Sequence, residues 1–250
     1  MMKKIIQLKT IINFTQTLTL LLCSTFTMAQ SIPLHKLTGQ FNEKNDSDFI
    51  ALDSTILPVN KKGMYLQKEP AQQLIKAYND FKKSYPDIPF IVVSATRNYT
   101  YQNGIWQRKW DALLPKLVGP QKIAKKILKL SSMPGTSRHH WGTDIDITSV
   151  SSEYFQNDKQ GIILYQWLRE NLPKYGFCQP FSEGRNGGYL PEEWHWSYKP
   201  IAKQYLVQYK TILETNPQTI LQNLNFTGSD KITLESLVKE YVLTVNSECY

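Results

Sequence analysis

The sequence predicts an α+β fold. Segments 143–148 and 194–198 alternate apolar and polar residues, as strands with one buried face do, and a β-branched run at 90–93 adds another buried strand. Several longer segments instead repeat apolar residues with helical spacing. Because these helices and strands do not alternate regularly, their order favours α+β over a doubly wound parallel sheet.

Helices are expected at 71–83, 99–114, 121–130, 161–175, 201–213 and 234–245. In the first of these, Leu74, Tyr78 and Phe81 recur with helical spacing. Pro70 stands where a helix can begin, and Pro86 ends the pattern. The chain has no internal repeat, and at 250 residues one domain with extensions is the default, with two small domains as the alternative.

The two alternating strands carry polar residues on one face. Between 143 and 148 the isoleucines point to one side, and Asp144 and Asp146 point to the other. Between 194 and 198 the tryptophans share one face, and His195 lies on the opposite face. These polar faces are where we expect chemistry.

The first 29 residues have the composition of a secretory signal peptide. A lysine-containing start is followed by an apolar, hydroxyl-rich stretch, and Thr27-Met28-Ala29 supplies small residues for cleavage after Ala29. An uncleaved membrane anchor is the alternative, but the apolar run is short and interrupted. Lipidation at Cys23 is disfavoured because the preceding Leu22 is bulky. We therefore expect a secreted or periplasmic protein without a stable membrane span.

The net charge limits the class of binding partner, and the cysteines limit the possible disulfides. The 250-residue chain has a formal charge of +8, which falls to +5 without residues 1–29. This excess suits an anionic envelope polymer, and no dense basic cluster with interleaved aromatic residues indicates nucleic acid. The mature chain keeps Cys178 and Cys249, which could form one disulfide outside the cytoplasm or remain free thiols.

Two short motifs offer metal ligands. His139 and Asp146 lie in the first motif, and Glu192 and His195 lie in the second. Two histidines and one aspartate suffice for a catalytic zinc ion, which keeps its fourth position for water. The remaining glutamate could take a proton from that water. The sequence has only four histidines, so few other zinc sites are possible.

The pattern Ser-x-His-x6-Asp followed by Glu-x-x-His resembles the zinc D-alanyl-D-alanine carboxypeptidases of the VanY type, in the M15 peptidase family. The segment from Ser94 through Arg97 to Gln102 and the Trp-His-Trp-x-Tyr ending at Tyr198 match as well. The resemblance covers roughly residues 60–200. It implies the hedgehog/D-Ala-D-Ala-peptidase-like fold, a small antiparallel sheet flanked by helices.

The resemblance also implies roles for individual residues. Zinc would be held by His139, Asp146 and His195, with Glu192 as the catalytic base. Arg97 would face the substrate carbonyl or the developing oxyanion. Ser137 and Gln102 would bind the terminal carboxylate or nearby amides of the substrate. Asp144 and Asn98 depart from the usual family residues, and the 113–136 stretch is longer than expected.

Two assignments stay open at this stage. On an ideal strand Glu193, rather than Glu192, shares a face with His195, so Glu192 reaches the metal only if the chain bends after Pro191. His140 could replace His139 as a ligand, but adjacent residues on a strand face opposite ways, so both do not bind one ion. The family pattern favours Glu192, and His139 is taken as the ligand.

We therefore predict a monomeric zinc D,D-carboxypeptidase that releases terminal D-Ala from peptidoglycan stem peptides. The alternatives are another peptidoglycan peptidase (L,D-carboxypeptidase, D,D-dipeptidase or endopeptidase) or a non-catalytic zinc-containing wall-binding module. The expected organisation is a signal peptide at 1–29, a lead-in at 30–62, a zinc peptidase domain at 63–205 and a C-terminal helical extension at 206–250.

Overall fold

The computed structural model describes residues 31–250, which form one unit. The expected signal peptide and the Cys23 assignment lie outside the described residues. The helices and strands, in chain order, are α1 (Leu34–Leu37), β1 (Phe49–Ala51), β2 (Tyr65–Gln67), α2 (Lys68–Ser84), β3 (Val92–Ser94), α3 (Tyr99–Leu113), α4 (Pro120–Ile127), β4 (Asp144–Ile147), α5 (Ser152–Asn157), α6 (Lys159–Asn171), β5 (Phe177–Cys178), β6 (His195–Tyr198), α7 (Lys199–Thr215), α8 (Gln218–Leu221) and α9 (Leu234–Leu243). Short 3₁₀ helices include η2 (Arg138–Trp141), η3 (Leu172–Tyr175) and η5 (Ser247–Cys249).

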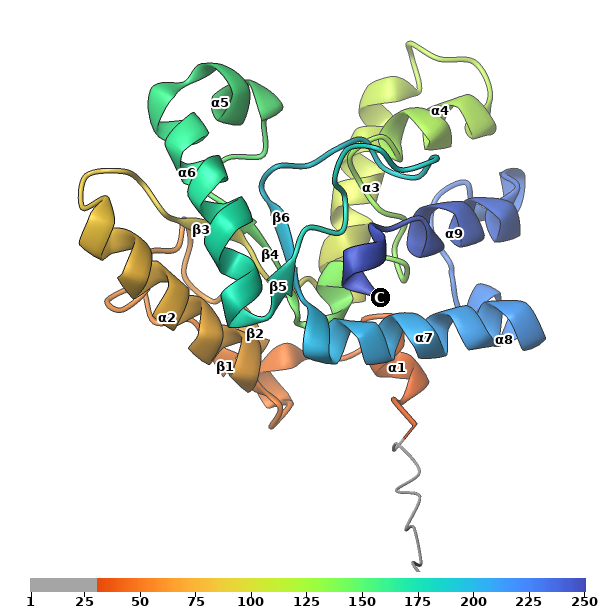
Figure 1. Ribbon diagram of the computed structural model, residues 1–250. Coiled ribbons are helices and arrows are strands. Elements are labelled where there is room, and N and C mark those ends of the chain that lie inside the picture. The colour runs from red at the N-terminus through yellow and green to blue at the C-terminus, as the bar shows by residue number, and fades with distance from the viewer. Residues whose placement is uncertain (1–30) are drawn as a thin grey trace, which may run out of the picture. The chain divides into compact units, whose positions relative to one another are not determined.

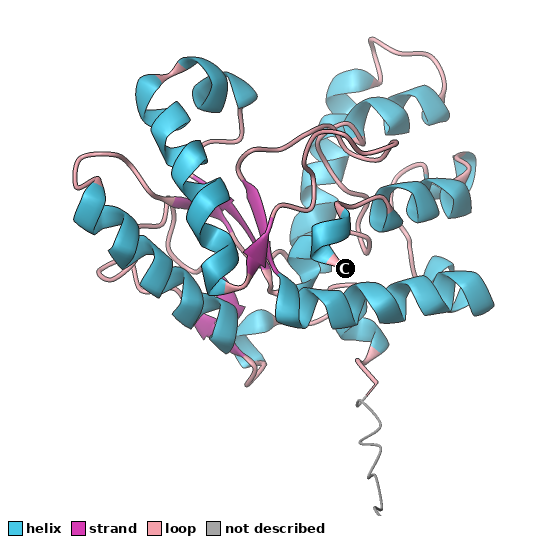
Figure 2. Ribbon diagram, in the orientation of Figure 1, coloured by secondary structure: helices cyan, strands magenta, loops and turns pink. Residues whose placement is uncertain are grey.

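A four-stranded antiparallel sheet in the order β3-β4-β6-β5 lies at the centre of the fold (Figures 1 and 2). Helices α2 and α6 lie on one side of it, and α3, α4, α7 and α9 lie on the other (Figure 1). The pair β1-β2 forms a separate small sheet. This architecture confirms the predicted α+β class with a small antiparallel sheet flanked by helices.

The two faces of the sheet differ as the alternation predicts. Ile145 and Ile147 of β4 and Trp196 of β6 pack with α2 and α6 in one apolar cluster. A second apolar cluster joins α3, α4, α7 and α9. The polar face of β4 and β6 is turned away from the first cluster, so its acidic and histidine side chains are free to face one another.

The expected helices are present, with ends that differ by a few residues. Helix α2 buries Leu74 and Phe81 as the spacing predicts, and it ends before Pro86. Helix α6 begins at Lys159 because the Asp158 carboxylate accepts hydrogen bonds from the amides of Gln160 and Gly161. The last residues of the expected 161–175 helix form η3.

The lead-in and the C-terminal extension belong to the folded unit. Within 30–62, strand β1 pairs with β2, and the backbone carbonyl of Leu37 accepts a hydrogen bond from the Trp141 indole. The expected boundary between residues 205 and 206 falls inside α7. A disulfide joins Cys178 of β5 to Cys249 of η5, the option that the sequence left open. Within residues 31–250, no helix is both long and apolar enough to cross a bilayer.

Candidate metal centre

The register of β4 against β6 places Asp146 opposite His195. His139 approaches from η2, which ends at Gly142 in the left-handed conformation (φ 70°) and turns the chain into β4. One ligand atom from each of His139, Asp146 and His195 lies within 4.8 Å of the others. The fold therefore brings the three predicted ligands together, and all three are buried.

The donor atoms suit a small tetrahedral cation. His139 Nε2 and Asp146 Oδ1 are buried and have no hydrogen-bond partner, which is costly unless something else binds them. Asp146 Oδ1 lies 3.4 Å from His139 Nε2 and 3.2 Å from His195 Nδ1. Ligands at 2.0–2.1 Å from a tetrahedral zinc ion are themselves roughly 3.4 Å apart. The residues present therefore fit zinc.

Each histidine is oriented through its other ring nitrogen. His139 Nδ1 donates to the backbone carbonyl of Ala95 at 2.7 Å, which leaves Nε2 with a free lone pair. His195 Nε2 lies 2.9 Å from Asp144 Oδ1, which leaves Nδ1 toward Asp146. Backbone carbonyls and carboxylates are the usual partners of metal-binding histidines, because they fix the ring and its tautomer.

Asp144, to which the sequence analysis gave no role in the metal site, lies at the centre of a buried hydrogen-bond network. Besides His195, its carboxylate accepts hydrogen bonds from Arg138 Nε at 3.0 Å, Ser197 Oγ at 2.9 Å and Thr143 Oγ1 at 2.5 Å. Burial alone would raise the pKa of Asp144, but the Arg138 charge and the His195 hydrogen bond outweigh it and lower that pKa. Asp144 is therefore an anion that can hold the His195 ring.

Replacing Asp144 by asparagine is expected to weaken zinc binding about 10- to 100-fold, because His195 loses the carboxylate that orients it. The measurement is zinc affinity by competition with a chromogenic chelator. Asp158→Asn, at the exposed cap of α6, is the matched control and should leave the affinity unchanged. Equal affinity of the Asp144 variant and the wild type would show that His195 does not need this partner.

Glu192 and Glu193 point to different places. The Glu192 Oε2 atom lies 3.4 Å from His195 Nδ1. The Glu193 carboxylate accepts hydrogen bonds from Ser152 Oγ and Gln156 Nε2, both at 2.7 Å and both on α5. Strand β6 begins only at His195, so the preceding turn frees Glu192 from the strand alternation. The structure thus places Glu192, and not Glu193, at the centre.

His140 is not available to bind a metal. Its Nδ1 donates to the Arg97 carbonyl at 2.5 Å, and its Nε2 accepts from the Gly135 amide at 3.0 Å. Burial lowers the pKa of His140 to about 3, so the ring is neutral. A side chain on Gly39 would begin 2.3 Å from this ring, so the close approach requires glycine.

Zinc binding is expected to strengthen as the pH rises. Burial lowers the pKa of His139, so this ring is neutral and adds no pH dependence near pH 7. For His195, burial is outweighed by hydrogen bonds to Asp144, Asp146 and Glu192, which raise its pKa well above the usual value. Zinc must displace that proton, so its affinity should rise up to tenfold per pH unit below this pKa. Chelator competition from pH 6 to 8 tests this, and a flat profile would contradict it.

The other predicted residues lie around the same centre. The Arg97 backbone is tied to both histidines, since its amide donates to the His139 carbonyl and its carbonyl accepts from His140. Its buried Nε atom has no partner. Gln102 donates through Nε2 to the Ser132 carbonyl at 2.8 Å, and its Oε1 is unpaired. Ser137 is buried with an unpaired hydroxyl. The roles predicted for these residues stay predictions.

We call the cavity beside the three ligands the metal pocket. It has a volume of about 230 Å³, and its lining includes Arg97, Lys109, Asp146, Tyr189, Glu192 and His195. Neither Gln102 nor Ser137 lines it. Lys109 and Tyr189 were not predicted, because only packing brings α3 and the 182–191 loop to this point. The signal for Asp144 was present, since it shares a strand face with Asp146.

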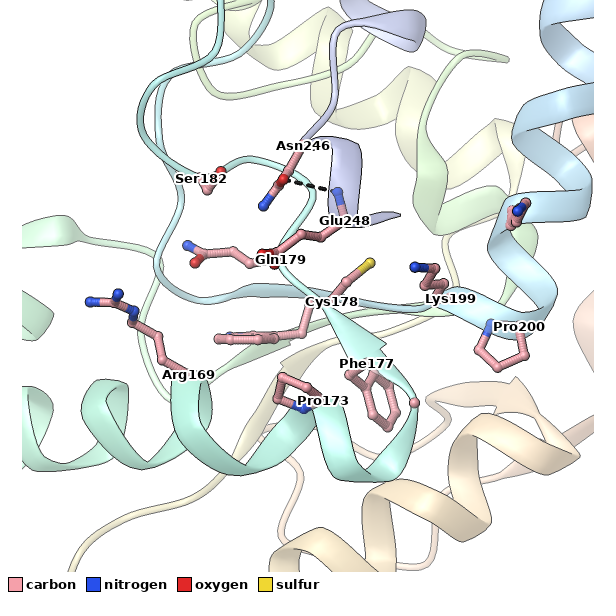
Figure 3. A pocket seen from close by; sticks show the side chains of 13 residues that line it. Arg169, Pro173, Phe177, Cys178, Gln179, Ser182, Lys199, Pro200, Asn246 and Glu248 are labelled. Atoms are coloured by element: carbon pink, nitrogen blue, oxygen red, sulfur yellow. Dashed lines mark hydrogen bonds between the residues drawn. The ribbon is translucent and has the colours of Figure 1, made fainter. Parts of the chain in front are cut away.

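A larger pocket of about 720 Å³ lies beside the disulfide, between η3, β5 and α7 (Figure 3). Arg169, Lys199 and Glu248 line it (Figure 3), and none of the predicted site residues does. Trp196 contributes to its wall from the strand face opposite to His195. The predicted ligands Asp146 and His195 and the predicted base Glu192 line the smaller metal pocket instead.

The family model of the VanY D-alanyl-D-alanine carboxypeptidases matches residues 63–201. The chain belongs to this family. The matched region contains every residue predicted for the site, and the resemblance inferred from the motifs is thereby confirmed.

Individual proteins are similar to parts of this chain. An uncharacterized protein of Haemophilus influenzae is 32% identical over 128 residues, which are 46% of this chain and 95% of that protein. The putative carboxypeptidase YodJ of Bacillus subtilis is 28% identical over 137 residues, or 54% of this chain and 46% of that protein. The solved LdcB LD-carboxypeptidase has 20% identity and a TM-score of 0.50, with 81% of each chain covered. That structural likeness supports the fold.

Proposed function

We propose that this protein is a zinc D,D-carboxypeptidase that releases terminal D-Ala from peptidoglycan stem peptides outside the cytoplasm. The observation that carries the proposal is the buried cluster of His139, Asp146 and His195 with the Glu192 carboxylate beside it. Family membership supports the reaction class, because the family description names D-alanyl-D-alanine carboxypeptidase. The donor set of two imidazoles and one carboxylate supports zinc.

The protein's residues have separate tasks in amide hydrolysis. When bound, zinc would supply a water molecule with a pKa lowered to about 7. The Glu192 carboxylate accepts a proton as that water adds to the amide carbon, and returns the proton to the amine nitrogen as the C–N bond breaks. Burial raises the pKa of Glu192, and the nearby Asp146 charge adds to this, which suits a group that both takes and returns a proton.

Arg97 has the properties needed to stabilise the charge that develops on the carbonyl oxygen. Arg97 carries a planar, cationic guanidinium and lines the metal pocket together with Glu192 and His195. Its backbone is fixed by the hydrogen bonds to His139 and His140, so its position follows that of the ligands. A cation placed beside the carbonyl oxygen stabilises the transition state more than the substrate.

The test is incubation of the zinc-loaded protein with purified tetrapeptide and pentapeptide muropeptides, followed by mass spectrometry. Loss of one alanine from the pentapeptide supports the proposal. Loss of D-Ala from the tetrapeptide alone would identify an L,D-carboxypeptidase instead. Zinc binding without any product would overturn the enzymatic proposal and favour a wall-binding module.

A further inference from the structure

The metal pocket contains cationic groups without acidic partners. Arg97 and Lys109 both line it, and neither forms an ion pair with any of the residues that the structure describes. The acidic groups of the pocket, Asp146 and Glu192, lie instead against the ligand histidines. A pocket with this charge pattern is complementary to an anionic group of the substrate.

Lys109, on α3, lines the metal pocket. Its ammonium donates to the hydroxyl of Ser131, a neutral partner that fixes its place without neutralising its charge. Partial burial lowers the pKa of Lys109, and the positive charge of Arg97 adds to this effect. An anion placed here would therefore gain a charge-assisted hydrogen bond that the free protein lacks.

The rest of the lining limits what can accompany that anion. Ile105, Leu130, Val150 and Trp194 give the metal pocket an apolar wall. Its volume of about 230 Å³ gives room for one residue beside the ligands. An apolar side chain on that wall with a carboxylate on the cationic side fits a C-terminal residue such as alanine.

We propose that Lys109 binds the free α-carboxylate of the residue that is released, and thereby selects peptides with an ionised C-terminus. The inference rests on the proposed carboxypeptidase function and adds a specificity-determining residue to it. The sequence motifs assigned the carboxylate to Ser137 and Gln102, which are buried outside the pocket lining. Of the two cations in the lining, Arg97 already has the proposed role at the carbonyl oxygen, which leaves Lys109 for the carboxylate.

The first test compares kcat/KM for a pentapeptide that ends in a carboxylate with that for the same peptide ending in a carboxamide. For the carboxylate peptide, Lys109→Met should lower kcat/KM about 10- to 100-fold, the range of a hydrogen bond to a charged group. For the carboxamide peptide it should change little, and Lys109→Arg should keep most of the preference. Lys122→Met, at an exposed position of α4, is the control and should change neither value. An unchanged carboxylate preference in Lys109→Met would overturn the proposal.

The second test does not depend on turnover. Binding of D-Ala-D-Ala to the zinc-loaded Glu192→Gln protein is measured by calorimetry, with and without Lys109→Met. The added substitution should weaken binding at least about tenfold. If Lys109→Met abolishes binding but the protein hydrolyses no muropeptide, carboxylate binding by Lys109 is supported and the carboxypeptidase function is rejected. If the enzyme is active but Lys109→Met changes neither binding nor the carboxylate preference, the carboxypeptidase function is supported and carboxylate binding by Lys109 is rejected. Absence of both binding and turnover would reject both proposals.

Discussion

Replacing Glu192 by glutamine is expected to lower kcat for D-Ala release about 10²- to 10⁴-fold, the usual contribution of a general acid–base group. Glutamine has nearly the same shape but neither accepts nor returns a proton at its amide. The zinc ligands keep their own partners, His139 with Ala95 and His195 with Asp144, so zinc content should stay at the wild-type level. Steady-state kinetics with metal analysis of the same sample measure both quantities.

Glu193→Gln is the matched control for this variant, because it makes the same chemical change one residue away. Glu193 accepts hydrogen bonds from Ser152 and Gln156, and the new amide group would face one of these donors. We therefore expect kcat within a few-fold of wild type and a loss of about 1–2 kcal/mol in unfolding free energy. The assignment of the base would be reversed if Glu193→Gln abolished turnover while Glu192→Gln did not.

Local sequence patterns predicted most of the helices but few of the contacts between elements that are distant in the sequence. The spacing of Leu74 and Phe81 identifies α2, because that helix places one apolar face on the sheet. Strand β1 has only three residues and gains its stability from pairing with β2, which lies beyond a long loop. A strand of three residues is too short to show an alternating pattern, so the sequence predicted only a lead-in at 30–62.

The ligands were predictable because their spacing is tied to chemistry, whereas their supporting residues were not. Asp144 shares a strand face with Asp146, but nothing local shows that Arg138 and Ser197 would turn it into an anionic support for His195. Placing Glu192 rather than Glu193 beside the ligands required knowing that β6 begins only at His195. Lys109 is a charged residue that its sequence alone would place on the solvent-facing side of α3, and only tertiary packing brings it to the metal pocket.

The C-terminal segment has a physical connection to the site that its sequence did not indicate. The Asn246 amide donates to the Pro180 carbonyl, and Arg185 donates to the Thr244 carbonyl at 3.1 Å. The rings of Tyr189 and Tyr241 are 5.0 Å apart. These contacts hold the loop between β5 and β6, which carries Tyr189 into the metal pocket. The disulfide between Cys178 and Cys249 closes the same connection covalently.

Removing that disulfide by Cys178→Ser/Cys249→Ser is expected to lower the unfolding free energy by about 4 kcal/mol, the chain-entropy value for cysteines 71 residues apart. For a domain of this size the loss corresponds to a decrease of roughly 10 °C in Tm, measured by calorimetry. Activity should also decrease, because Glu192 follows the loop that the C-terminal segment holds, and its amide donates to the Phe181 carbonyl at 2.9 Å.

A reductant separates the effect of the covalent link from that of the serine side chains. Added to the wild type, it should lower Tm toward that of the double variant, and added to the variant it should change nothing. The hydrogen bond from Asn246 to Pro180 does not depend on the sulfur atoms, so the reduced protein should still fold at 25 °C. If reduction left the wild-type Tm unchanged, the non-covalent contacts alone would account for the stability of the C-terminal segment. If it lowered Tm but left kcat intact, the loop would keep Glu192 in place without the C-terminus.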